Sequence, residues 1–156
     1  MMFYKMSGGE NMAQTLVEFG RSIQTNLDNG VIVPITATPS LILQFGINVP
    51  AATNFVELTT TVGWQVTNVF ATPPDQPKLF LQVLMDGVVV GSAEQESISN
   101  DEDEPLEMTT TFQTILTNVT VGFHSFQVFA SNPDDLQGDI TLTGPINITG
   151  KVYVPA

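Results

Sequence analysis

Residues 78–90 read KLFLQVLMDGVVV: a nearly continuous apolar run, then Asp86-Gly87, then three valines. An Asp-Gly pair between two apolar runs is typical of a two-residue hairpin turn, because both turn positions need a positive φ. We therefore expect two antiparallel strands joined at Asp86-Gly87, within a fold of antiparallel β-structure.

Similar strand patterns extend in both directions from this hairpin. The stretch 55–66 places Val56, Leu58, Thr60 and Trp64 on one face. Further strands are expected at 31–37, 40–49, 108–119, 122–130, 140–142 and 146–154. Eight or nine short strands with turn signals between them, and no helical pattern between strands, favour a sandwich. The sequence thus predicts an all-β jelly-roll β-sandwich over residues 31–156.

Residues 1–30 differ in character and are expected to form a connector or assembly arm. Large apolar side chains precede a Ser7-Gly8-Gly9 hinge: Met1, Met2, Phe3, Tyr4 and Met6. Met12, Leu16, Phe19 and Ile23 then follow at spacings of four, three and four, which is typical of a helical stripe, and Asn29-Gly30 is a helix stop. We expect a short helix that needs a partner; a frayed tail is the alternative.

One internal echo links Glu57-Leu58-Thr59-Thr60-Thr61-Val62 with Glu107-Met108-Thr109-Thr110-Thr111-Phe112. The two stretches are expected either to be equivalent strands in facing sheets or to be alike by chance.

Composition excludes several classes of partner. The 156 residues carry a formal net charge of −12, with only 13% charged residues and four cations, Lys5, Arg21, Lys78 and Lys151. Nucleic-acid binding needs clustered cations, and a membrane helix needs about 20 apolar residues, so neither nucleic acid nor a membrane is an expected partner. The absence of cysteine excludes disulfides and thiolate chemistry. No Sec-type signal peptide is expected.

The acidic residues form no convincing metal site. Asp101 and Asp103 lie in a run of adjacent acids without the alternate spacing and glycine of a calcium loop. Together with Asp134 and Asp135 they are only weak calcium candidates, so we expect no metal.

The residues that could support catalysis are isolated in the sequence. His124, the single histidine, has no nucleophile or metal ligand at a recognisable spacing and is interpreted as structural. Glu57 and Glu107 are the strand-borne candidates for a glycosidase pair, and Trp64 is either a sugar platform or, more in keeping with its residue type, a core residue. We expect no enzyme activity, no catalytic residue and no cofactor.

Several strands resemble those of a known family. The stretches 55–65, 109–112 and 121–128 and Gly144-Pro145-Ile146-Asn147-Ile148-Thr149-Gly150 resemble small exosporium proteins of spore-forming bacilli, of the exosporium protein C type. The resemblance covers roughly residues 31–154. It implies a structural role on the spore surface, and a jelly roll like the trimeric heads of tumour-necrosis-factor-like and complement-like proteins.

Sequence and resemblance together predict a self-assembling subunit of the exosporium or of an appendage fibre. Its expected partners are other copies of itself, as a trimer or a head-to-tail filament, and other spore surface proteins. In this hypothesis residues 1–6 dock on a neighbouring subunit, and the stripe from Met12 to Ile23 packs along the oligomer axis. The alternative is a carbohydrate- or receptor-binding jelly roll such as a phage or viral fibre head.

Overall fold

The chain folds as a β-sandwich of two antiparallel sheets. The computed structural model describes residues 14–69, 76–97 and 105–155. Its strands are β1 Thr15–Thr25, β2 Val33–Ile35, β3 Ser40–Val49, β4 Phe55–Thr67, β5 Lys78–Met85, β6 Val88–Glu96, β7 Leu106–Leu116, β8 Gly122–Ser131 and β9 Asp139–Val154. One turn of 3-10 helix, Asp135–Gln137, precedes β9. The all-β prediction is confirmed.

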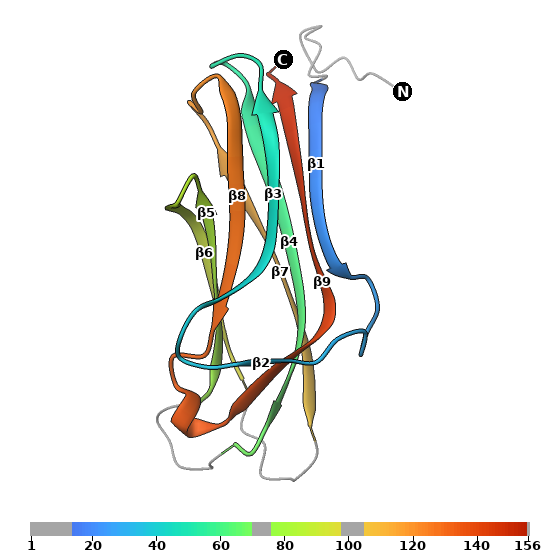
Figure 1. Cartoon of the computed structure of the whole chain (residues 1–156), viewed down its shortest axis with the longest axis vertical. Coiled ribbons are helices and arrows are strands. Elements are labelled where there is room, and N and C mark those ends of the chain that lie inside the picture. The colour runs from blue at the N-terminus through green and yellow to red at the C-terminus, as the bar shows by residue number, and fades with distance from the viewer. Residues whose placement is uncertain (1–13, 70–75, 98–104, 156) are drawn as a thin grey trace, which may run out of the picture.

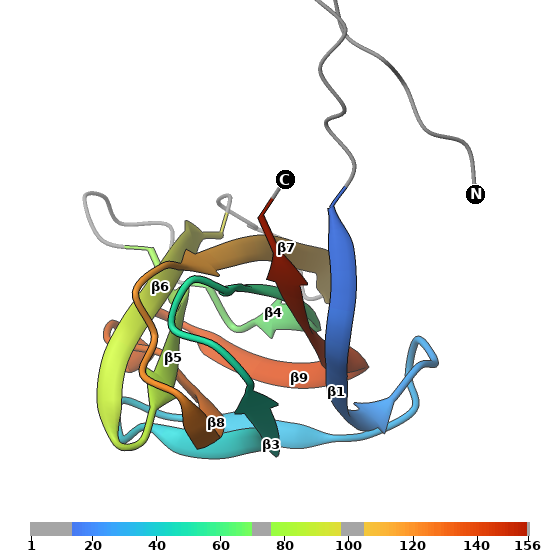
Figure 2. The same cartoon turned by 90° about the horizontal axis from the view of Figure 1, so that it is seen from above.

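The strand order identifies a jelly roll. One sheet has the order β1-β9-β4-β7, with β2 also paired to β9, and the other has the order β3-β8-β5-β6. Four antiparallel pairs therefore nest inside one another: β5–β6, β4–β7, β3–β8 and β1–β9. Figure 1 shows these pairs side by side, and Figure 2 shows the two layers from above. Double-sheet nesting of this kind is the jelly-roll architecture.

The β5–β6 hairpin is formed as the sequence predicts. Asp86 and Gly87 have φ values of 50° and 85°, as a two-residue turn between twisted strands requires. Met85 pairs with Val88 directly across the turn.

The core lies between the sheets and consists mainly of apolar side chains, with Thr60 among the few buried polar ones. On β4 every second residue from Val56 to Val66 is fully buried. Trp64 is the largest of these side chains, and its indole nitrogen donates to Thr110 Oγ1 over 3.0 Å. The Thr110 hydroxyl donates in turn to Gln95 Oε1. Trp64 thus combines a large buried surface with a satisfied polar atom, which confirms its interpretation as a core residue.

β9 is the longest strand and contains a bulge. Between its pairs with β4, Val62–Ile146 and Trp64–Leu142, β9 advances four residues while β4 advances two. The two extra residues leave Gly144 against Gly63, where a Cβ on Gly63 would lie 1.9 Å from the Gly144 carbonyl oxygen. Glycine at position 63 is therefore required by this close approach.

The predicted N-terminal helix is wrong. Thr15–Thr25 forms β1, which pairs antiparallel with β9, so the five-stranded sheet includes a strand upstream of the predicted boundary at residue 30. Two register shifts within the β1–β9 pairing, one near each end of β1, explain the error. The shift between Leu16 and Glu18 adds one residue, so Leu16 and Phe19 pair with Tyr153 and Lys151 and share the outer face despite their spacing of three.

The interpretation of the internal echo is also corrected. The two stretches lie in β4 and β7, which are neighbours in one sheet, with Thr61 paired to Thr111. They do not occupy facing sheets. Within the ranges that the structure describes, no helix is long and apolar enough to cross a membrane.

We expect Gly63→Ala to destabilise the fold by about 3 kcal/mol, because the added methyl group forces the β9 bulge away from β4. Thr61→Ala, two residues away on the same outer face, is the control and should cost less than about 1 kcal/mol. Urea unfolding at constant pH measures both values. Equal midpoints for the two variants would contradict the close approach of Gly63 and Gly144.

Candidate functional site

The turn of the β5–β6 hairpin is bonded to β8 through Asp86 and His124. Asp86 Oδ2 lies 2.5 Å from His124 Nδ1, and Asp86 Oδ1 accepts from the Ser125 N–H over 2.8 Å. The Asp86 N–H donates to the Ser125 carbonyl, also over 2.8 Å. His124 Nε2 lies 2.6 Å from the Thr120 carbonyl oxygen. The Asp86–His124 pair therefore joins the hairpin turn, β8 and the connection that precedes β8.

These partners favour the protonated histidine. A carbonyl oxygen only accepts, so Nε2 carries a proton, and a carboxylate opposite Nδ1 favours a second one. The bonds to the Thr120 carbonyl and then to Asp86 raise the pKa of His124 above its ordinary value of 6.5. The Ser125 N–H, and then His124, lower the pKa of Asp86 below its ordinary value of 3.8. His124 is buried and bonded at both nitrogens, which confirms the structural interpretation.

The outer face of the five-stranded sheet carries an apolar corner at the end where β1 begins. Adjacent register positions bring together Leu16, Phe19, Phe55, Ile115 and Tyr153. The Phe55 and Tyr153 rings are stacked with centroids 5.3 Å apart. Leu16 and Phe19 are about half exposed, and Ile115 is 60% exposed. This corner lies where the chain enters the sheet from residues 1–13.

Of the predicted arm residues, three fall within the structure. Leu16, Phe19 and Ile23 lie on β1, each with nearly half of its surface exposed. They share the outer face of a strand, so three of the four residues of the predicted stripe lie on one face, although not on a helix. The remaining arm residues lie outside the described residues: Met1, Met2, Phe3, Tyr4, Met6 and Met12.

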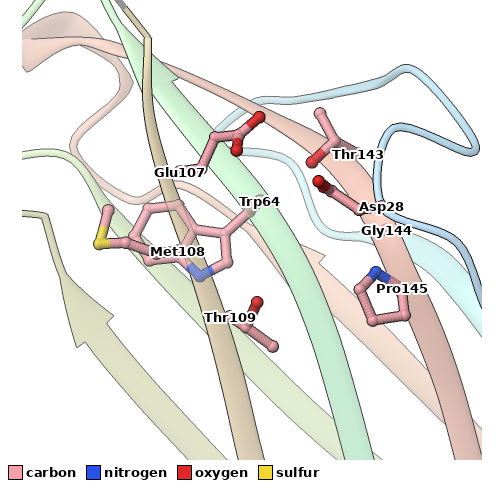
Figure 3. Close-up of a pocket in the computed structure, with 8 residues that line it drawn as sticks. All are labelled: Asp28, Trp64, Glu107, Met108, Thr109, Thr143, Gly144 and Pro145. Carbon is pink, nitrogen blue, oxygen red and sulfur yellow. The ribbon is translucent and has the colours of Figure 1, made fainter.

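A hollow lies on the same outer face, toward the other end of β1, and we name it the β9 hollow. It has a volume of 210 Å³ and is lined by Asp28, Trp64, Glu107, Met108, Thr109, Thr143, Gly144 and Pro145. Figure 3 shows Glu107, Thr143 and Asp28 directed toward a common space from β7, β9 and the connection after β1. Asp28 and Glu107 are exposed, so both carboxylates are solvated at its rim.

The carboxylates and the tryptophan do not form a glycosidase site. Glu107 pairs with Gln65, eight residues along β4 from Glu57, which separates the two carboxyl groups by about 26 Å. Paired carboxylates in glycosidases lie about 5 to 10 Å apart. Trp64 touches the hollow but has no exposed surface, so it forms a floor and offers no ring for sugar stacking.

The weak calcium candidates within the structure are already engaged. Asp134 Oδ2 lies 3.2 Å from Lys78 Nζ, and Asp135 Oδ2 accepts from the Ala37 N–H over 3.1 Å. Asp101 and Asp103 lie outside the described residues. Within the described part of the chain, no three acidic or histidine side chains gather closely enough to hold a metal ion.

Sequence reasoning missed two features of these surfaces. The Asp-Gly signal located the turn, but it carries no information on the bond from Asp86 to His124, 38 residues away. The β9 hollow depends on the bulge at Gly144, for which Gly144-Pro145 was the only local signal.

The Asp86–His124 pair makes stability depend on pH. The His124 contribution is fully present below about pH 6.5 and is lost as pH rises through its raised pKa. The Asp86 contribution is present above about pH 4 and is lost as pH falls through its lowered pKa. Both therefore act together near pH 5.

We expect Asp86→Asn to lose about 1 kcal/mol of stability at pH 5 and less at pH 9. This loss is smaller than the usual stability contribution of a hydrogen bond to a charged group, because the Asp86 side chain is 48% exposed. Urea unfolding at both pH values, with the NMR titration of His124, measures the change, and Glu96→Gln is the control. A His124 pKa that is unchanged in Asp86→Asn would contradict the pairing.

Comparisons with known proteins do not assign this chain to a family. No family model matches the sequence, and no curated protein matches it. Among solved structures, the chain is similar to dimeric latent PorU from Porphyromonas gingivalis, at 12% identity and a TM-score of 0.47, over 90% of this chain and 13% of PorU. It is also similar to a chain of infectious bursal disease virus, Gx strain, at 14% identity and a TM-score of 0.23, over 90% of this chain and 37% of the viral chain. This chain thus spans a small part of each of these proteins.

Proposed function

We propose that this protein is a structural, self-assembling subunit of a bacterial spore surface, in the exosporium layer or in an appendage fibre. Its partners are other copies of itself, in a trimer or a head-to-tail filament, and other spore surface proteins. The spore-surface part of the proposal rests on the sequence resemblance described above. Residues 1–6 act as an arm that docks on a neighbouring subunit.

Two observations support assembly: the apolar sequence of residues 1–6 and the exposed apolar side chains of the edge strand β1. Five large apolar residues stand within residues 1–6, and the chain then enters the sheet through β1, an edge strand with Leu16, Phe19 and Ile23 exposed on its outer face. Exposed apolar patches of this kind mark interaction surfaces. Among the described residues, no three acidic or histidine side chains gather closely enough to hold a metal ion, and Glu57 and Glu107 lie too far apart for a glycosidase pair.

The binding-module alternative has less support. A sugar-binding face needs exposed aromatic rings, and Trp64 is fully buried. Phe123 has the most exposed aromatic ring in the described part of the chain, at 72%, and it lies over Gly46, where a Cβ would meet the ring at 1.9 Å. It fills the space of a missing side chain, as aromatic residues beside strand glycines do.

We expect deletion of residues 1–11 to abolish polymerisation while the sandwich stays folded. The full-length variant Phe3→Ser/Tyr4→Ser/Met6→Ser should behave in the same way, because it removes apolar surface without shortening the chain. Negative-stain microscopy measures filaments or discrete oligomers, and far-UV circular dichroism reports the fold. The control is Asn11→Ser/Gln14→Ser, which should assemble normally. Assemblies of normal length from both arm variants would refute the proposal.

A further inference from the structure

The β9 hollow has the size of a site for one side chain. Its 210 Å³ is below the roughly 300 to 1,000 Å³ of small-molecule sites and well above the roughly 30 Å³ of a water molecule. Its walls are partly apolar, with the Pro145 ring beside the backbone of Gly144. A single large apolar side chain of a docking segment fits these dimensions.

Charge adds a second requirement for the occupant. The carboxylates of Asp28 and Glu107 stand at the rim, and no basic group in the described parts of the chain lies within 4.0 Å of either. An occupant therefore gains from a cation next to its apolar side chain.

The cations within the sandwich already have other neighbours. Lys78 is paired with Glu94 and Asp134, Arg21 lies over the Phe19 ring at 5.9 Å, and Lys151 is the register neighbour of Glu57. The fourth cation is Lys5, which stands between Tyr4 and Met6. Residues 3–6 thus combine the apolar side chains and the charge that the hollow requires.

The length of the chain favours docking on a second copy. β1 spans about 33 Å from Thr15 to Thr25, and the hollow begins beyond Thr25. Ten residue steps from Lys5 to Thr15 reach at most about 36 Å, and a reversal of direction takes about four residues that add no length. The segment therefore falls short of the hollow of its own subunit.

We propose that the β9 hollow receives residues 3–6 of a second copy, with Lys5 between Asp28 and Glu107 and a neighbouring apolar side chain inside. This inference rests on the proposed function, and it identifies the surface that the arm binds. The two ends of β1 lie far apart along the sandwich (Figure 1). Residues 1–13 join the chain at the Thr15 end of β1, and the residues that line the hollow lie toward the Thr25 end, so the contact joins different surfaces of the two copies, as a head-to-tail filament requires.

A charge-reversal experiment tests the contact in the full chain. Lys5→Glu and Glu107→Lys should each lower the fraction of pelletable assemblies at least fivefold, and the combined variant should recover to within about twofold of the unchanged protein. The matched control is Glu96→Lys, a glutamate on β6 that is also exposed, which should assemble normally. Loss in Glu107→Lys without recovery in the combined variant, or equal loss in Glu96→Lys, would overturn the proposed receptor.

Cysteine crosslinking gives a second, independent test, since the chain has no cysteine of its own. Separately purified Met6→Cys and Thr109→Cys proteins are mixed, allowed to assemble and oxidised. A disulfide-linked heterodimer on a non-reducing gel is expected for Thr109→Cys. It should be at least fivefold weaker for Gln113→Cys, which shares the strand and face of Thr109 but lies about 13 Å away. Equal crosslinking of Thr109→Cys and Gln113→Cys, or no crosslinking of either, would overturn the proposal that the β9 hollow receives the arm.

The two proposals can fail separately. If the polar arm variant still forms normal assemblies, the proposed function is wrong. If the polar arm abolishes assembly while Glu107→Lys and the Thr109→Cys crosslink have no effect, the arm remains the assembly element and the β9 hollow is not its receptor.

Discussion

The turn at Asp86-Gly87 is the centre of the nested strand pairing on which the whole sandwich depends. β5 and β6 meet across it, and each further pair, β4–β7, β3–β8 and β1–β9, encloses the pairs before it. Because closing a longer loop costs more chain entropy, the inner hairpin is the pairing that forms at the least cost. The outer pairs then join strands already brought close. The bonds from Asp86 to Ser125 and His124 hold this centre against β8.

β9 lies inside the five-stranded sheet and pairs with three other strands. It pairs with β4 along one edge and with β1 and β2 along the other. A strand without a bulge does not match the registers of all three partners. The two extra residues of β9 at the Gly144 bulge allow all three pairings. Bulges re-aim the chain beside functional surfaces. Here the bulge raises Gly144 and Pro145 above the sheet and creates the hollow beside Thr109 and Glu107.

Local patterns predicted the inner part of this fold better than the outer part. The β5–β6 hairpin, the buried face of β4 and the limits of β3 follow from turn chemistry and alternation, which depend on neighbouring residues. β1 was predicted as a helix because its register shift places Leu16 and Phe19 on one face at helical spacing. The hollow, and the bond between Asp86 and His124, join residues far apart in sequence, where periodicity carries no information.

Assembly of such an acidic chain needs a contact that lowers its self-repulsion. Residues 14–156 carry fifteen acids and three cations, so the whole formal net charge of −12 belongs to them, while Lys5 and Glu10 cancel within residues 1–13. Two sandwiches therefore repel each other at most orientations. Residues 1–9 carry one cation and no acid, so this segment approaches the acidic surface with attraction. Under the proposed docking, the charge of Lys5 favours the carboxylate-rimmed hollow over the corner at Phe55 and Tyr153, because Arg21 and Lys151 lie beside Phe19 in that corner.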